Sequence, residues 1–181
     1  MYEKTKEYLI ATAKEAGSQY DYLLRHLPLV EKWARKLLVF YPEASEDIVL
    51  MRVWLHDIGQ ILGNKEVDHA INSEAEAKRY LTEIGANNDI VEKVAHCTRS
   101  HRCKDVQPSS IEAQILAVAD SASHMTDIVY IDMSNRGEFE DALGKLERDY
   151  RDVGILPKFQ ESLKPLYDSW KQLLEVYPKE I

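Results

Sequence analysis

Apolar side chains recur every three or four positions along most of this chain, which is the spacing of one buried face on an α-helix. The longest such run begins at Tyr20 and ends at Tyr41, immediately before Pro42. Because Pro28 lies inside this run, we expect either a kinked helix or a helix that begins near Leu27. The same spacing predicts further helices over residues 2–16, 45–57, 68–84, 88–101, 109–125, 138–151 and 158–177.

No segment shows sustained alternation of apolar and polar residues with a period of two, the pattern of a half-buried strand. The predicted fold is therefore all-α, a single helical bundle of about seven or eight helices. Capping residues support the predicted helix starts: Asp68 for the fourth helix, Asn88 or Asp89 for the fifth, and Ser109 with Glu112 as a capping box for the sixth.

The composition indicates one globular domain. The chain has 181 residues, enough to bury a sizeable core, and contains only seven Gly and six Pro. We expect a single domain over residues 1–181, with its candidate chemistry in residues 20–130 and C-terminal helices over residues 138–177.

Charge and segment composition argue against several classes of partner. The formal net charge is −8 and Lys and Arg form no cluster, so double-stranded nucleic acid is not an expected partner. The N-terminus has no apolar signal segment, and no apolar run reaches the ~18 residues of a membrane span. Cys97 and Cys103 are expected to be free thiols in a cytoplasmic protein without membrane contact. Nothing in the sequence indicates the oligomeric state.

The most unusual polar feature is the pair His56-Asp57, which follows the apolar residues 53–55 and precedes Gly59. A carboxylate buried at such a position is costly unless a cation or hydrogen-bond donors satisfy it. An imidazole nitrogen beside a carboxylate oxygen is a ligand set that Zn, Fe and Mn sites use. A lone His-Asp pair is nevertheless more often a helix end, at which Asp57 caps and His56 packs.

Helical spacing separates two neighbouring histidines. His101 shares a stripe with Val94 and Cys97 on the core side of its predicted helix, whereas His96 falls on the polar side. His101 is therefore a candidate metal ligand, and His96 is expected to face solvent. A zinc site built from Cys97, Cys103 and these histidines lacks the Cys-x-x-Cys spacing of structural zinc sites, so we do not favour it.

Four further polar residues fall at positions of interest. His26 lies on the apolar side of its helix, and His69 lies in the first turn of the helix predicted over residues 68–84. Asp120 stands inside an unusually apolar helix. His124 follows one turn later, either as a partner of Asp120 or on the helix surface, which we favour. Polar residues on core faces usually have partners there, and one convergent metal centre would account for them if the helices bring them together.

The order of these residues resembles a known family. His26, then His56-Asp57 within His-Asp-Ile-Gly, then Asp120 after an apolar run resemble the H…HD…D pattern of the HD-domain metal-dependent phosphohydrolases. Asp68-His69 and the segment Arg99-Ser100-His101-Arg102 also resemble the parts of the family that supply two extra histidines to a second metal. The similarity covers about residues 20–130.

The resemblance implies a divalent metal bound by His26, His56, Asp57 and Asp120. In a version with two metals, Asp57 would bridge to a second ion held by His69 and His101. Asp57 would then be the central catalytic residue, because two cations a few ångströms apart polarise a phosphoryl group and acidify a bridging water. The ligand set does not distinguish Fe, Mn, Zn, Mg, Co and Ni, nor one ion from two.

The chain also departs from the family pattern. Many members carry a lysine immediately after His-Asp-Ile-Gly, where this chain has Gln60. Contacts to a substrate phosphate would then fall to Gln60 itself and to Arg99, Arg102 or Lys104, which read equally well as a solvated loop surface. The Gly-Tyr-Pro motif of the cyclic-dinucleotide branch is absent, because Ile-Leu-Gly occupies residues 61–63.

We therefore expect a metal-dependent phosphohydrolase that acts on a small phosphate ester, with a nucleotide as the favoured substrate. Three alternatives stay open: an HD-fold diiron oxygenase with the same ligands, a non-catalytic domain that senses a metal or nucleotide, and a helical interaction domain with buried histidines. Bound iron and an oxygen-dependent product would indicate the oxygenase, whereas the interaction domain would bind no metal.

Overall fold

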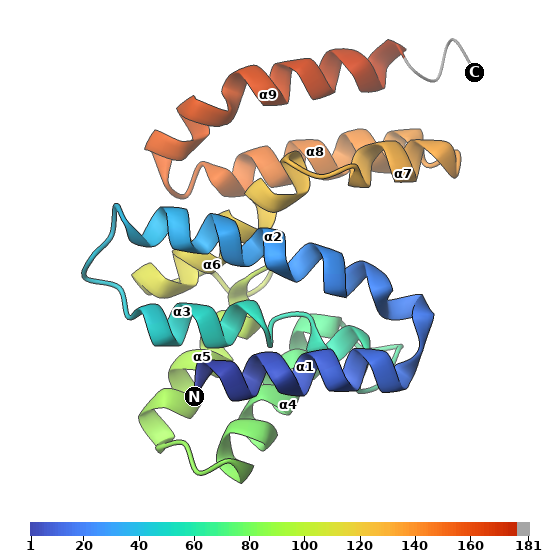
Figure 1. Cartoon of the computed structure of the whole chain (residues 1–181). Helices are drawn as coiled ribbons and strands as arrows, with labels where there is room; N and C mark the ends of the chain where they lie inside the picture. The colour runs from blue at the N-terminus through green and yellow to red at the C-terminus, as the bar shows by residue number, and fades with distance from the viewer. Residues whose placement is uncertain (177–181) are drawn as a thin grey trace. The chain divides into compact units, whose positions relative to one another are not determined.

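The computed structural model describes residues 1–176, and every regular element within them is helical (Figure 1). The all-α prediction is confirmed. The elements of these residues are α1 (Tyr2–Ala16), η1 (Ser18–Tyr20), α2 (Asp21–Leu38), α3 (Glu46–Val53), η2 (Ile58–Gln60), α4 (His69–Glu83), α5 (Asn88–Ser100), α6 (Ile111–Met125), α7 (Val129–Asn135), α8 (Phe139–Val153) and α9 (Pro157–Val176), where η denotes a short 3₁₀-helix. The predicted end of the last helix, residue 177, lies outside the described residues.

The chain divides into two compact units, residues 1–117 and residues 118–181. The first unit contains α1 to α5 and the beginning of α6, and the second contains the remainder of α6 with α7 to α9. The expectation of one domain over residues 1–181 stays a prediction.

An apolar core holds α3, α4 and α5 together in the first unit. Its buried members are Ile48, Met51, Leu55, Ala77, Tyr80, Leu81, Val91 and Val94. Leu55 and Leu81 are both 0% exposed, and burial of one such side chain contributes about 1.5–3 kcal/mol. α4 packs along α5, and α3 contacts α1, α2 and α5. The residues that follow α3 are therefore carried into the interior of this unit.

Gly59 allows α4 to pack directly on η2. A Cβ atom at Gly59 would lie 2.3 Å from the carbonyl oxygen of His69 and 2.5 Å from the amide nitrogen of Ser73. Instead, the Gly59 N–H donates a 2.8 Å hydrogen bond to Ser73 Oγ. Because Gly59 has no side chain, the start of α4 can approach the turn that carries Asp57. This hydrogen bond holds α4, and His69 with it, in that position.

Two helix caps differ by one residue from the prediction. Asn87, rather than Asn88 or Asp89, caps α5, and its side chain accepts a 2.9 Å hydrogen bond from an N–H of the first turn. Ser110, rather than Ser109, accepts the corresponding bond of α6 at 3.2 Å. Several good capping residues stand in a row at both places, and the residue immediately before the helix is the one that caps.

The middle of the second unit contains a helix that the apolar pattern does not predict, α7, which has only seven residues. α8 packs against both α7 and α9. Aromatic pairs join these elements: the Tyr150 and Tyr167 rings stack with centroids 4.0 Å apart, and the Tyr130 ring meets the edge of Trp170 at 5.3 Å. The Trp170 indole also donates a 2.9 Å hydrogen bond to the carbonyl of Met125, which ties α9 to the end of α6.

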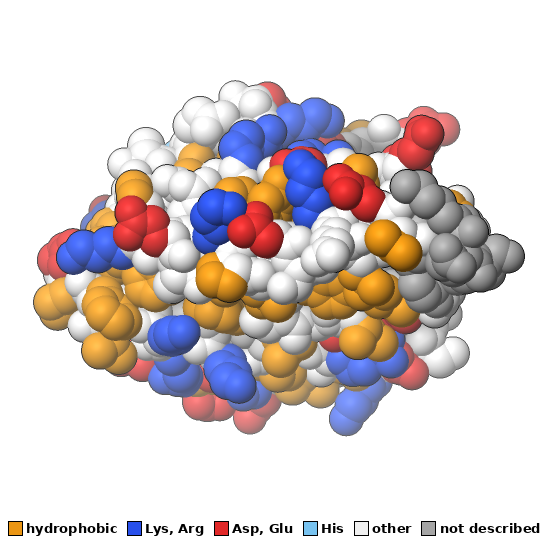
Figure 2. Space-filling view, turned by 90° about the horizontal axis from the view of Figure 1, so that it is seen from above, with side chains coloured by type: hydrophobic (Ala, Val, Ile, Leu, Met, Phe, Trp, Pro, Cys, Tyr) orange, Lys and Arg blue, Asp and Glu red, His pale blue; other side chains and the backbone are white. Residues whose placement is uncertain are grey.

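Charged side chains of both signs are interspersed on the surface. Figure 2 shows one face, on which Lys and Arg lie close to Asp and Glu, with apolar side chains among these charged groups. Surface pairs such as Lys164 with Asp168, 2.7 Å apart, are screened by solvent and contribute little to stability. Among the described helices, none combines the length and apolarity needed to cross a membrane.

Candidate metal centre

Asp57 lies in a tight turn between α3 and η2. We predicted a helix that continues to Asp57, but α3 ends at Val53. The chain tightens there because the N–H of Leu55 donates to the carbonyl of Arg52, three residues back, at 3.0 Å. This turn leaves Asp57 only 6% exposed and His56 fully buried.

His26 reaches the same region from α2. This helix begins at Asp21 and contains Pro28 as an internal residue, so the alternative start near Leu27 is wrong. His26 is 8% exposed. Its ring lies edge-on to that of His56, with centroids 5.8 Å apart.

Two of the histidines are oriented by the same kind of backbone contact. His56 Nδ1 lies 2.9 Å from the carbonyl oxygen of Val53, and His101 Nδ1 lies 2.6 Å from that of Thr98. A carbonyl oxygen only accepts, so Nδ1 carries the proton in both rings. Nε2 is then the basic nitrogen and faces Asp57, which is the tautomer that a metal ligand requires.

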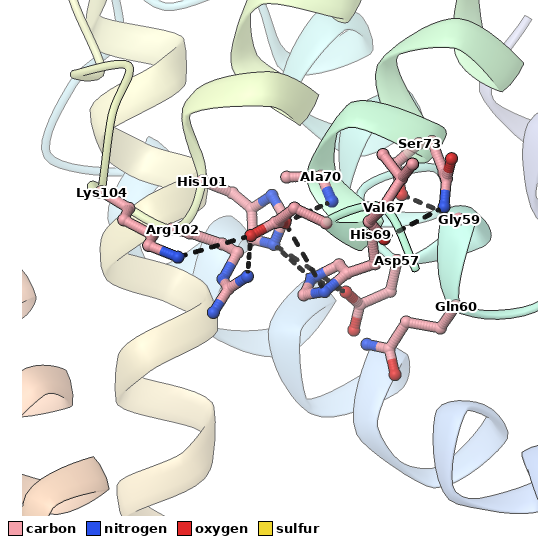
Figure 3. A network of polar contacts seen from close by, with 12 residues as sticks. Asp57, Gly59, Gln60, Val67, His69, Ala70, Ser73, His101, Arg102 and Lys104 are labelled. Carbon is pink, nitrogen blue, oxygen red and sulfur yellow. Dashed lines mark hydrogen bonds and ion pairs between the residues drawn. The ribbon is translucent and has the colours of Figure 1, made fainter. Parts of the chain in front are cut away.

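Four imidazoles present Nε2 to the two oxygens of Asp57. On one side, Nε2 of His26 and of His56 lie 3.9 and 3.6 Å from Oδ2. On the other side, Nε2 of His69 and of His101 lie 3.2 and 3.8 Å from Oδ1 (Figure 3). Three of these distances are longer than that of a hydrogen bond. Two ligand atoms that are each ~2.1 Å from one ion lie ~3.0–3.4 Å apart, so a small contraction would suit a metal.

Two of the groups of potential metal ligands share Asp57. In one group with His26 and His56, and in a second with His69 and His101, all ligating atoms lie within 4.8 Å of one another. Nε2 of His69 and Nε2 of His101 are 3.3 Å apart. Imidazole nitrogen with carboxylate oxygen is a donor set for divalent transition metals. This buried group could hold a divalent metal.

The charge of Asp57 is maintained by its neighbours. Burial by itself would raise the pKa of the Asp57 carboxyl. The nearby imidazoles of His56, His69 and His101 lower it, and their combined effect is larger than that of burial. They hold the pKa of the Asp57 carboxyl well below its usual range. Asp57 is therefore an anion in the interior of the first unit, ready to act as a ligand.

Asp68 positions His69 and anchors the loop that follows α5. Its side chain accepts a 3.0 Å hydrogen bond from the Ala70 N–H, so the predicted cap of α4 is confirmed. The same carboxylate pairs with Arg102, and Lys104 Nζ lies 3.8 Å away. The cap therefore joins the start of α4 to the segment just after His101.

Asp120 lies on α6 in the second unit, where it is half-buried. Its participation in the metal centre stays a prediction. His124 Nε2 is 3.7 Å from Asp120 Oδ1. We expected His124 on the helix surface, and this was wrong: α8 covers that face of α6, and the His124 side chain is only 17% exposed beside Lys145 and Asp149.

An open pocket of about 280 Å³ lies beside His69. Its walls are polar and consist of Gly59, Gln60, Asn64, Lys65, Val67, Asp68, His69, Asn72 and Arg102. Two of the residues predicted to contact substrate, Gln60 and Arg102, thus line a cavity next to the metal centre. The pocket contains two cationic side chains and the one carboxylate of Asp68.

The other two residues predicted to contact substrate lie away from the pocket walls. The Arg99 guanidinium donates a 2.9 Å hydrogen bond to Asp105 and lies 3.7 Å from Glu74. The Lys104 side chain is 68% exposed. A role for Arg99 and Lys104 in substrate binding stays a prediction. The interpretation as a solvated surface fits Lys104, but the Arg99 side chain is only 15% exposed.

Sequence reasoning missed Lys65 and Tyr22. Lys65 lies on the pocket wall, donates to the backbone carbonyl of Gln60, and contacts Tyr20 Oη at 2.9 Å. The Tyr22 hydroxyl donates to the Gln60 side chain, and burial, with smaller contributions from Asp57 and Tyr20, raises the pKa of Tyr22 to about 12. The one available signal was that Lys65 shares the short loop of Gln60.

His96 and the cysteines stand apart from the centre. His96 is half-buried, and its Nε2 lies 2.9 Å from the Ser109 hydroxyl. Cys97 is buried beside Ser110, and burial raises the pKa of its thiol to about 11, which disfavours a thiolate ligand. No group of potential metal ligands within residues 1–176 includes a cysteine.

The fold and the site define an all-α protein with a buried histidine–aspartate group suited to a divalent metal. Residues 23–125, more than half of the chain, match the family model of the HD domain. The chain therefore belongs to the HD domain family, the superfamily of metal-dependent phosphohydrolases. No curated protein and no solved structure gives a significant match.

Proposed function

We propose that this protein is a metal-dependent phosphohydrolase that cleaves a small phosphate ester, with a nucleotide as the favoured substrate. The observation that carries the proposal is the arrangement around Asp57: two imidazoles face each of its oxygens through Nε2. A divalent metal, when bound there, acidifies a coordinated water and neutralises phosphoryl charge.

Different side chains of this centre would coordinate the two metal ions. His26, His56 and Asp57 would hold one ion, and Asp57, His69 and His101 a second. Asp120 is proposed as the remaining ligand of the first ion. The backbone contacts of His56 and His101 fix their rings before a metal arrives, so little orientation is lost on binding.

The pocket beside His69 is proposed to receive the phosphate ester. Lys65 and Arg102 place positive charge on its walls, and Gln60, Asn64 and Asn72 offer amide groups. An anionic group is favoured there because the two cations outnumber the single carboxylate of the walls. The volume of about 280 Å³ is near the lower end of small-molecule sites, ~300–1,000 Å³.

Arg102 and Lys65 already have partners, which makes them positioned charges. Arg102 is paired with the carboxylate of Asp68, and Lys65 with a carbonyl and a phenol. Side chains held in this way lose less conformational entropy when they bind a ligand. This favours direct phosphate recognition over a freely solvated loop.

The test is hydrolysis of a panel of phosphate esters by protein purified without chelator. Nucleoside mono-, di- and triphosphates, a cyclic nucleotide and p-nitrophenyl phosphate are compared by release of phosphate or of the alcohol. We expect turnover of at least one ester that stops after metal removal and returns when divalent metal is added.

Each alternative predicts a different result in the same samples. Iron content with an oxygen-dependent product would indicate oxygenase chemistry. Metal and nucleotide binding without turnover would indicate a sensor. Protein that contains no metal, and binds none when it is added, would overturn the proposal in favour of an interaction domain with buried histidines.

A further inference from the structure

A chain of polar contacts leads from Asp120 to the interior of the second unit. Nε2 of His124 faces Asp120 Oδ1 at 3.7 Å, and Nδ1 of His124 lies 3.4 Å from Asp149 Oδ1 on α8. The hydroxyl of Tyr130, on α7, donates a 2.7 Å hydrogen bond to the other oxygen of Asp149. Asp149 is 5% exposed and Tyr130 is fully buried, so the hydrogen bond between Tyr130 and Asp149 is shielded from water.

Of the two charged groups of α8 that face Nδ1 of His124, Lys145 is nearer than Asp149. Its Nζ lies 3.1 Å from His124 Nδ1 and 3.4 Å from Asp149. An ammonium group only donates, so the contact with Lys145 favours the neutral ring with its proton on Nε2, whereas the more distant Asp149 would favour a proton on Nδ1. With the proton on Nε2, the N–H faces the carboxylate of Asp120, and a small shift would shorten the 3.7 Å distance to that of a hydrogen bond.

We propose that His124 positions the Asp120 carboxylate as a metal ligand, and that Lys145, Asp149 and Tyr130 hold His124 in place for this role. The inference rests on the proposed function, in which Asp120 binds metal. In this proposal His124 is a positioning residue that acts through Asp120, although its own ring nitrogens are also potential metal ligands. Carboxylate ligands commonly need such outer partners, whose loss lowers metal affinity by ~10–100-fold.

The location of these residues makes the inference specific to this chain. The match to the HD domain ends at residue 125. Lys145, Asp149 and Tyr130 all lie beyond it, on helices α7 and α8.

The experiment compares Zn²⁺ affinity in three variants of the full chain by competition with a chromophoric chelator. Zn²⁺ is chosen because nitrogen and oxygen sites bind it more tightly than Mn²⁺ or Fe²⁺. His124→Leu should weaken one Zn²⁺ site by ~10–100-fold. His124→Gln keeps a side-chain N–H at a similar reach, so it should recover most of the affinity.

Tyr167→Phe is the control for Tyr130→Phe, although the carboxylate partner of Tyr167 is more exposed than that of Tyr130. Both phenols donate to a carboxylate of the second unit, Tyr130 to Asp149 at 2.7 Å and Tyr167 to Glu147 at 2.8 Å. Only Tyr130 is connected to His124. We expect weaker Zn²⁺ binding in Tyr130→Phe and wild-type binding in Tyr167→Phe, with urea unfolding measured for both.

The outcomes distinguish this inference from the proposed function. Wild-type protein that binds no Zn²⁺ overturns both. Wild-type protein that binds Zn²⁺ while folded His124→Leu binds it within twofold of wild type overturns the inference alone. Equal losses in the Leu and Gln variants, or in the two Tyr→Phe variants, would also overturn it, because they would indicate a packing effect.

Discussion

Replacement of Gly59 by Ala tests the close packing that brings His69 to Asp57. The new Cβ would lie 2.3 Å from the His69 carbonyl oxygen, 2.5 Å from the Ser73 nitrogen and 2.7 Å from Asn72 Cβ. Two of these atoms belong to the backbone of α4 and cannot rotate away. Since real Cβ contacts are rarely shorter than 3.0 Å, the start of α4 must move by at least 0.7 Å.

This displacement has two measurable consequences. Overpacking of a close contact costs typically ~1–3 kcal/mol, and the Gly59–Ser73 hydrogen bond of 2.8 Å would be strained as well. We therefore expect the free energy of unfolding in urea to fall by about 2–3 kcal/mol. Because His69 moves with α4, the metal group of Asp57, His69 and His101 should also lose affinity.

Gly144→Ala is the control for Gly59→Ala. A Cβ at Gly144 would meet only the end of the flexible Arg148 side chain, at 3.3 Å. Gly144 lies inside α8, where Ala is favoured over Gly by about 0.5–1 kcal/mol, so this variant should be slightly more stable than wild type. If the Gly59→Ala variant were as stable as the wild type and contained as much metal, the packing argument would be refuted.

Three further substitutions test individual side chains. Asp57→Asn removes the shared charge, so metal content and turnover should be lost together; retention of both would contradict the assignment of Asp57. His101→Ala should remove one bound metal ion. His96→Ala should lower the free energy of unfolding by about 0.5–1.5 kcal/mol, the contribution of its hydrogen bond to Ser109, and leave the metal content unchanged. The reverse pattern would mean that the ligand is His96. Lys65→Gln should raise KM for a phosphate ester more than it lowers kcat, because the charge acts in binding. An unchanged KM would contradict a role of Lys65 in substrate binding.

The sequence predicted the fold class and the facing of several residues, because helical periodicity records burial directly. It placed His101 on a core face and His96 on another side, and the structure has His101 buried and His96 half-buried beside Ser109. The same argument failed for His124, because α6 is apolar on more than one side and periodicity does not show which helix covers each side.

Features that depend on tertiary contacts were beyond the sequence. Nothing in the spacing indicated that two histidines would face each oxygen of Asp57, since the histidines come from four different segments. Lys65 was missed because its contacts to Tyr20 and Gln60 arise from the course of a loop. α7 was missed because a helix of seven residues has too few turns to show a period.

The measurement that tests the central claim most directly is elemental analysis of the wild-type protein purified without chelator, alongside Asp57→Asn. If Asp57 joins two pairs of histidines around divalent metal, the wild type should contain one or two ions per chain and the variant essentially none. A well-folded wild type without bound metal, and without uptake of added Fe²⁺, Mn²⁺ or Zn²⁺, would contradict the account.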